Sequence, residues 1–210
     1  MAYSDAIGGN GFCIIDPHGD IAQEILDYIP RYRIKDVIYF NPADTKFPVA
    51  FNPLKGVHPD FHHLAASGII SSLKKIWAES WGPRMEHILR FTLLTLLEYP
   101  NATLLDIQPL LTNAEFRTQV LNFVKNPATI AFWMNEFAKY SPNLKSEAVS
   151  PIINKTSIFL TSIPLRNIVG QKTNSFKIQS VLDEGKILIV NLSKELLGED
   201  ASTLMGSFLV

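Results

Sequence analysis

Three short apolar runs constrain the fold of this chain more than any other feature of its sequence. Residues 12–15 (Phe-Cys-Ile-Ile) contain no polar residue and lie between Gly11 and Asp16. Residues 36–40 and 186–192 have the same β-branched and aromatic character. Unbroken runs of this length are typical of strands in parallel sheets, where both faces are covered. We therefore expect an α/β sheet, with the strand at 12–15 buried on both faces.

A helix is expected between the first two strands. Ile21, Ile25 and Tyr28 recur at helical spacing, Asp20 is available as the N-cap, and Pro30 ends the segment. A strand, helix and strand within about 30 residues form a βαβ unit with a right-handed crossover. A second helix is expected from about Asp200, after the last apolar run.

Residues 60–160 predict helices only, because apolar residues recur at threes and fours between turn signals. Thr103 with Asp106 forms a capping-box pattern, and Asn126 precedes Pro127 as at a helix start. About five or six helices are expected from this spacing. The turn signals are Gly82-Pro83, Tyr99-Pro100-Asn101, Thr112-Asn113, Asn126-Pro127 and Ser141-Pro142-Asn143.

The predicted architecture is a parallel α/β sheet interrupted by an inserted all-α subdomain. The first part of the α/β core covers residues 1–58, the helical bundle 59–164, and the return to the core 165–210. The segment 83–98 is apolar nearly all round, which predicts a helix at the centre of the bundle.

The composition of the chain limits the kinds of function it can have. The chain has 47% hydrophobic and 19% charged residues, a net charge of −1 and one cysteine, Cys13. It therefore has no global attraction to phosphate backbones, and no internal disulfide can form. No apolar stretch suffices to cross a membrane, so we expect a cytoplasmic protein. The apolar run 206–210 stops as an unfinished helix face, which favours an interior piece of a longer chain.

The pentapeptide Asp16-Pro17-His18-Gly19-Asp20 lies where a strand turns into a helix, at the sheet edge where α/β proteins bind ligands. Two carboxylates and an imidazole can hold a metal-bound water or orient a nucleophile near a phosphate, and a glycine tolerates its close approach. The alternative is structural: Asp16 ends the strand, Gly19 makes the turn and Asp20 caps the helix. Both interpretations remain open from spacing alone.

A metal-dependent hydrolase is a further alternative, with Asp16, His18 and Asp20 joined by His62 and His63. Pro17 and Gly19 argue against it, because a turn scatters the three side chains, and we expect no metal site. No G-x-x-x-x-G-K-[ST] sequence occurs, and the cluster 8–11 precedes a strand, so it is better explained as a helix end. The chain alone is therefore not expected to hydrolyse ATP.

Several linked motifs resemble one family. Residues 11–20, 37–44 and 51–54 look like the segment that follows the P-loop helix in FtsK/HerA-superfamily ATPases, with the coupling proteins of type IV secretion (TraG/TraD type) most similar. The similarity continues through 82–90, 148–155, 165–171 and 184–193.

The resemblance implies a RecA-like motor that assembles as a hexameric ring and moves DNA by hydrolysing ATP with magnesium. It implies that Asp16, His18, Gly19 and Asp20 lie close to the nucleotide, with Asp16 and Asp20 near the metal or attacking water. Walker A and Walker B sequences are missing here, so neither ATP nor magnesium is expected to bind this chain tightly. Partners implied are DNA, further subunits, a secretion channel and relaxosome proteins, at the cytoplasmic face of an inner membrane. A soluble HerA-like repair or mobile-element translocase fits equally well.

Two further groups of residues are candidates for contacts. Arg166 can reach a neighbouring subunit's phosphate or serve as a salt-bridged surface residue. A basic aromatic face for DNA or a substrate protein can form here, or else a solvated rim with core-anchoring tryptophans. Its residues are Lys74, Lys75, Arg84, His87 and Arg90, near Trp77 and Trp81. A non-enzymatic helical adaptor is the alternative function for the whole chain.

Overall fold

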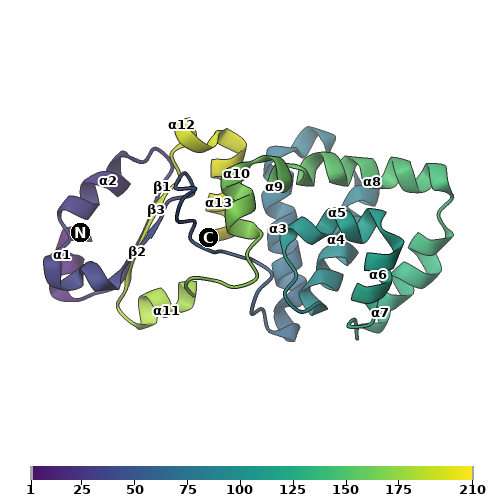
Figure 1. The fold of residues 1–210 in the computed structure, drawn as a ribbon, viewed down its shortest axis with the longest axis horizontal. Coiled ribbons are helices and arrows are strands. Elements are labelled where there is room, and N and C mark those ends of the chain that lie inside the picture. Colours follow the sequence, from purple (N-terminus) through teal and green to yellow (C-terminus); the bar gives the residue numbers. More distant parts are fainter. Residues whose placement is uncertain (1, 210) are drawn as a thin grey trace.

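The computed structural model describes residues 2–209 and places a small sheet at one end and a helical bundle at the other (Figure 1). Within these residues the strands are β1 (Phe12–Asp16), β2 (Val37–Phe40) and β3 (Ile187–Asn191). The helices are α1 (Ala2–Gly8), α2 (Asp20–Asp27), α3 (His62–Ile76), α4 (Pro83–Glu98), α5 (Ile107–Thr112), α6 (Ala114–Leu121), α7 (Pro127–Ala131), α8 (Pro142–Thr156), α9 (Ile158–Thr161), α10 (Ile163–Val169), α11 (Ile178–Asp183), α12 (Lys194–Leu197) and α13 (Glu199–Leu209).

All three strands are parallel, in the order β1-β3-β2, and each coincides with an apolar run of the sequence. The α/β class is therefore confirmed in its coarse form: a small parallel sheet in a mostly helical chain. β3 joins the sheet from the far end of the sequence and lies between the two strands of the βαβ unit. Its five residues are all buried, as expected for a central strand.

The two faces of the sheet are covered unequally. Helices α1 and α2 lie against one face, over Ile187 and Ile189, while Leu188 and Val190 on the other face belong to the main core (Figure 1). The prediction that residues 12–15 are buried on both faces is wrong, because β1 is an edge strand of this sheet and Cys13 is exposed. Neighbouring atoms still cover part of the Cys13 sulfur, and this partial burial raises the pKa of the thiol.

Most predicted helix boundaries are confirmed. Gly82, Asn113, Asn126 and Ser141 are the N-cap residues of α4, α6, α7 and α8, and the side chains of the last three accept backbone N–H groups. The capping box of Thr103 and Asp106 forms, although it opens a short 3₁₀ turn before α5. Six α-helices, α3 to α8, lie within residues 60–160, in agreement with the five or six predicted, and the short helix α9 begins at the end of this range.

Helix α4 spans the predicted residues and lies at the centre of the bundle, where it contacts α3, α5, α6, α7 and α8. The main core runs without interruption from Phe40 and Val190 in the sheet to Ile88 and Phe137 in the bundle. Helix α13 packs against α3, with Ser72 Oγ 3.5 Å from the carbonyl of Ser207. The core is thus continuous across the predicted domain boundaries.

A buried asparagine ties the segment after β2 to the bundle. Asn52 is 1% exposed; its Nδ2 donates to the carbonyl of Ala102 (2.8 Å), and its Oδ1 accepts from the N–H of Leu54 (3.0 Å). The backbone N–H of Asn52 donates to Asn174 Oδ1 at 2.7 Å. Asn52, which belongs to the 51–54 motif, therefore holds three separate segments of the chain together.

No helix within residues 2–209 combines the length and the apolar character that a bilayer crossing requires.

Candidate functional site at the carboxyl edge of the sheet

The polar residues that follow β1 and β3 meet at the carboxyl edge of the sheet. Asp16 at the end of β1 is in register with Asn191 at the end of β3. The chain then stays paired, because the N–H of Leu192 donates to the carbonyl of Asp16 (2.8 Å) and that of Lys194 to Pro17 (3.3 Å). Two segments about 175 residues apart in sequence therefore form one polar edge, at the position where parallel sheets bind ligands.

Asp16 is the buried anchor of this edge. Its side chain is 3% exposed; Oδ1 accepts from the N–H of His18 (2.9 Å) and Oδ2 from the N–H of Ala22 (2.9 Å). Burial would raise the pKa of Asp16, but backbone N–H groups, with Ala22 first and His18 next, outweigh it and lower the pKa. The carboxylate is thus charged and bound to the first turn of α2, which assigns it a positioning role.

The prediction that Asp20 caps α2 is wrong. Gly19 is the N-cap residue, Asp20 is the first helical residue, and no side chain of the cap accepts a hydrogen bond. Asp16 reaches the first-turn amides from four residues before α2 and takes over that function. Asp20 therefore keeps its carboxylate exposed at the helix N-terminus, where a negative charge is favourable.

Gly19 is required by the close approach of two loops. Its φ is 95°, and a Cβ at this position would lie 2.8 Å from Asn191 Oδ1 and 3.1 Å from Ser193 Cβ. Asn191 is held in place in turn, since its Nδ2 donates to Tyr39 Oη (3.0 Å) and its Oδ1 accepts from the N–H of Ser193 (3.1 Å). Neither Asn191 nor Tyr39 was predicted as a site residue; the signal for Asn191 was a polar residue that ends a buried strand.

We expect Gly19→Ala to lower the free energy of unfolding by about 2 kcal/mol, because the new Cβ meets Asn191 and the backbone is left-handed. Gly68→Ala is the matched control: Gly68 lies inside α3 with no atom near its Cβ position, so this change should stabilise by about 0.5 kcal/mol. Urea denaturation followed by circular dichroism measures both. Equal midpoints for the two variants would show that the contact with Asn191 carries no strain.

His18 and Asp20 carry the exposed ionisable side chains of the pentapeptide. Neither side chain makes a hydrogen bond or ion pair with any residue in the 2–209 range, so both are open to a ligand. The histidines of the metal-hydrolase alternative, His62 and His63, begin α3 and line a cleft of the helical bundle. Residues 2–209 contain no group of three or more histidine, cysteine or acidic side chains placed to share a metal ion. The ligand set proposed for that alternative is therefore not brought together.

The predicted basic face is partly neutralised by one carboxylate. Glu86 accepts from Trp81 Nε1 (2.7 Å), Arg90 Nη2 (3.1 Å) and Lys74 Nζ (3.4 Å). The hydrogen bond from Trp81 is the main cause that lowers the pKa of Glu86. Lys75 and Arg84 are exposed and have no ion pair among the described residues. Trp77 and Trp81 pack half-buried against the core, as anchors do.

Arg166 lies on the exposed side of α10. The interpretation of Arg166 as a salt-bridged surface residue is not matched, since no carboxylate of residues 2–209 forms an ion pair with it. Its role toward a neighbouring subunit stays a prediction.

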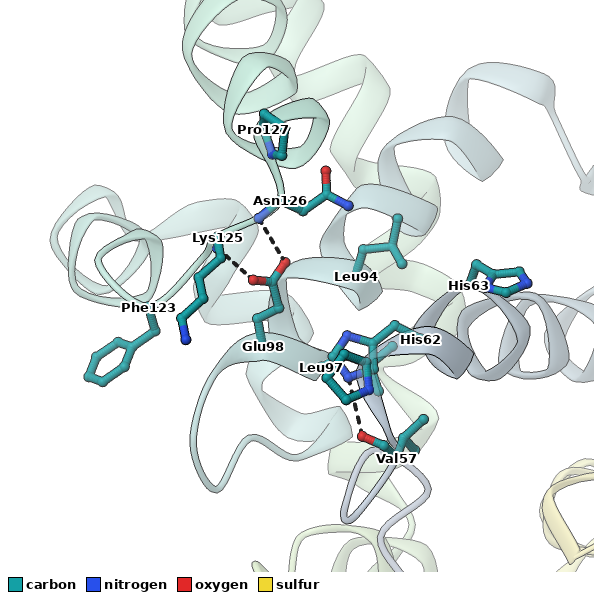
Figure 2. A pocket seen from close by; sticks show the side chains of 11 residues that line it. Val57, His62, His63, Leu94, Leu97, Glu98, Phe123, Lys125, Asn126 and Pro127 are labelled. Atoms are coloured by element: carbon teal, nitrogen blue, oxygen red, sulfur yellow. Dashed lines mark hydrogen bonds between the residues drawn. The ribbon is translucent and has the colours of Figure 1, made fainter.

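A cleft of about 670 Å³ lies apart from this edge, in the helical bundle (Figure 2). It is bounded by the start of α3, the end of α4 and the segment between α6 and α7, and it was not foreseen from the sequence. Its lining is mainly apolar, whereas the sheet edge is polar. Cavity size and polar chemistry therefore point to two different places, and we assign the candidate site to the sheet edge, because only there do charged and glycine residues converge.

The edge can orient a polar ligand but offers no phosphate-binding loop. A helix N-terminus, an exposed carboxylate and an exposed imidazole lie within five consecutive residues, held by Asp16 and Asn191. Comparison of the chain with protein-family models, with curated proteins and with solved structures finds no significant match.

Proposed function

We propose that this chain is part of the motor domain of a ring-forming, ATP-driven DNA translocase similar to the coupling proteins of type IV secretion. The observation that carries the proposal is the meeting of the Asp16–Asp20 and Asn191–Lys194 segments at the carboxyl edge of a parallel sheet. A RecA-like core uses this edge for its nucleotide. The string of motifs that resembles the FtsK/HerA superfamily runs through both segments.

In this proposal the residues at the sheet edge lie next to the nucleotide but do not bind its phosphates. Asp16 holds the loop and the first turn of α2 in place, and Gly19 allows the two segments to approach. Asp20 and His18 face outward, where they can orient a water molecule or a metal-bound water. ATP and magnesium fit only at the border of this chain, since the residues that bind phosphate oxygens must come from outside the 210 residues.

The helical bundle is the inserted subdomain of the motor. Lys75 and Arg84 are its unpaired cations near α4 and are the strongest candidates for DNA or partner contacts. Lys74 and Arg90 share Glu86, so their contribution to DNA binding should be smaller. Ring assembly would place Arg166 of one subunit toward the nucleotide of the next.

The reading frame around the chain tests the proposal. A G-x-x-x-x-G-K-[ST] sequence within about 60 residues upstream, and an apolar strand that ends in Asp-Glu within about 60 residues downstream, are expected for a P-loop motor. Stop codons on both sides would exclude ATP turnover by the product and leave the adaptor function.

A non-enzymatic helical adaptor is the second candidate, because the cleft of about 670 Å³ lies in the bundle and not at the sheet edge. An adaptor binds its partner through the bundle and is indifferent to ATP. Purified product of the complete reading frame that shows no change in melting temperature with magnesium and ATP would favour this candidate.

A further inference from the structure

The cleft in the helical bundle has an apolar floor that no helix within residues 2–209 covers. Leu94 and Leu97 of α4 lie in it half-buried, while Leu93 and Leu96 on the same helix are buried in the core. The excess of leucines that makes α4 apolar all round is explained by this cleft. A concave apolar surface of about 670 Å³ has the size of a site for a small organic ligand.

The apolar lining continues on the opposite wall. Phe123 is 47% exposed and packs edge-on against Tyr99, with ring centroids 5.4 Å apart. Val57, Pro59 and Pro127 complete the lining. The hollow beside β2, at about 270 Å³, is less than half as large. Binding of an apolar group to such a concave apolar surface is favourable, because it displaces water from both.

The cleft has one carboxylate and one ammonium, and the two differ in whether the described residues already bind them. Glu98 is its single carboxylate, and its oxygens accept the backbone N–H groups of Lys125 and Asn126 (Figure 2). This negative charge is therefore engaged in holding the segment between α6 and α7. The Lys125 ammonium has no partner among residues 2–209, and the same is true of the His63 ring.

His62 contributes a directed polar atom. Its Nε2 lies 3.3 Å from the carbonyl oxygen of Val57, so in the tautomer that donates there, Nδ1 remains an acceptor. The cleft thus presents hydrocarbon on its floor and walls, one free cation and two imidazoles.

From this juxtaposition we propose that the cleft binds a small amphipathic anion: a ring or branched hydrocarbon that carries a single acidic group. The hydrocarbon packs on Leu94, Leu97 and Phe123, and the acidic group lies beside Lys125. This site is independent of the proposed motor function, and its ligand is recognised by apolar contact and one charge.

Two fluorescent probes test the proposal on the full 210-residue chain. 8-Anilinonaphthalene-1-sulfonate carries the apolar ring system and a sulfonate, and N-phenyl-1-naphthylamine has the same rings without the charge. Phe123→Ser should weaken both probes about fivefold, because it removes apolar surface from the wall. Lys125→Gln should weaken only the sulfonate, by about threefold, as expected for one solvent-exposed charge.

Lys139→Gln is the matched control, since Lys139 is also an exposed lysine but does not line the cleft. In addition, sulfonate binding should shift the imidazole proton resonances of His62 and His63 and leave that of His18 unchanged. The proposal is overturned if neither probe binds, if the affinities of Lys125→Gln and Lys139→Gln agree, or if Phe123→Ser leaves both probes unaffected. An absence of ATP turnover in the product of the complete reading frame would not alter these binding results, so the two proposals are tested separately.

Discussion

Replacement of Arg33 by methionine is expected to lower the free energy of unfolding by about 3 kcal/mol or more. Arg33 is 5% exposed, and its guanidinium joins four groups at the amino edge of the sheet. Nε donates to Asp36 Oδ2 (2.9 Å), Nη1 to the carbonyl of Ala6 (3.0 Å), and Nη2 to the carbonyls of Asn10 and Gly185. Methionine fills the volume but leaves these acceptors without a donor.

Arg31→Met is the control, because Arg31 is exposed and forms no ion pair with the residues that the structure describes. Its effect should stay within about 0.5 kcal/mol. Arg33→Lys should recover only part of the loss, since one ammonium cannot reach carbonyls on several segments. Chemical denaturation measures all three variants. If Arg33→Met and Arg31→Met unfold at the same midpoint, the guanidinium does not hold the sheet to α1.

Asp16→Ala is expected to destabilise by about 2 to 3 kcal/mol, because the buried N–H of Ala22 and the partly buried N–H of His18 lose a charged acceptor. Asp20→Ala is the control within the same motif. Asp20 is exposed and acts only through the helix dipole, so its removal should cost about 0.5 kcal/mol. Comparable losses in both variants would contradict the anchor role of Asp16.

The pH dependence of stability gives an independent check on Asp16. Its pKa in the folded state is lowered, whereas in the unfolded chain it is near the ordinary value of about 3.9. The stabilisation is therefore complete above about pH 4 and is lost as the pH falls through the folded-state value. The difference in unfolding free energy between wild type and Asp16→Ala should be constant from pH 7 to 5 and shrink below about pH 4. A constant difference down to pH 2 would contradict the lowered pKa.

Much of the fold follows from local sequence patterns. The three strands, the span of α4 and four helix starts were predictable because each depends on neighbouring residues: an apolar run, a period of 3.6, or a cap. The order β1-β3-β2 was not predicted, since it depends on which strands pair across about 150 residues. The exposure of Cys13 follows from that order and could not be inferred from the run 12–15 alone.

The candidate site was predictable in its first half only. The pentapeptide 16–20 is recognisable as a strand-to-helix turn, but its partner Asn191 is brought to it by sheet pairing. From the sequence, Asp16 could serve in catalysis or only end the strand, and its contacts with the amides of His18 and Ala22 favour a positioning role. Arg33 gave no signal, since a buried arginine on a short 3₁₀ segment looks like any surface arginine in the sequence.

DNA-stimulated ATP hydrolysis by the product of the complete reading frame tests the central claim most directly, with wild type compared with Asp20→Asn. Asp20 is exposed, so this change should leave the fold intact while lowering ATP turnover by at least about tenfold, within the range for a group that orients water. His18→Ala in the same assay reports on the second exposed group. Hydrolysis that DNA stimulates in wild type and that Asp20→Asn lowers is the predicted result. Turnover unchanged by Asp20→Asn, or absent from the wild-type product, would contradict the placement of the nucleotide at this edge.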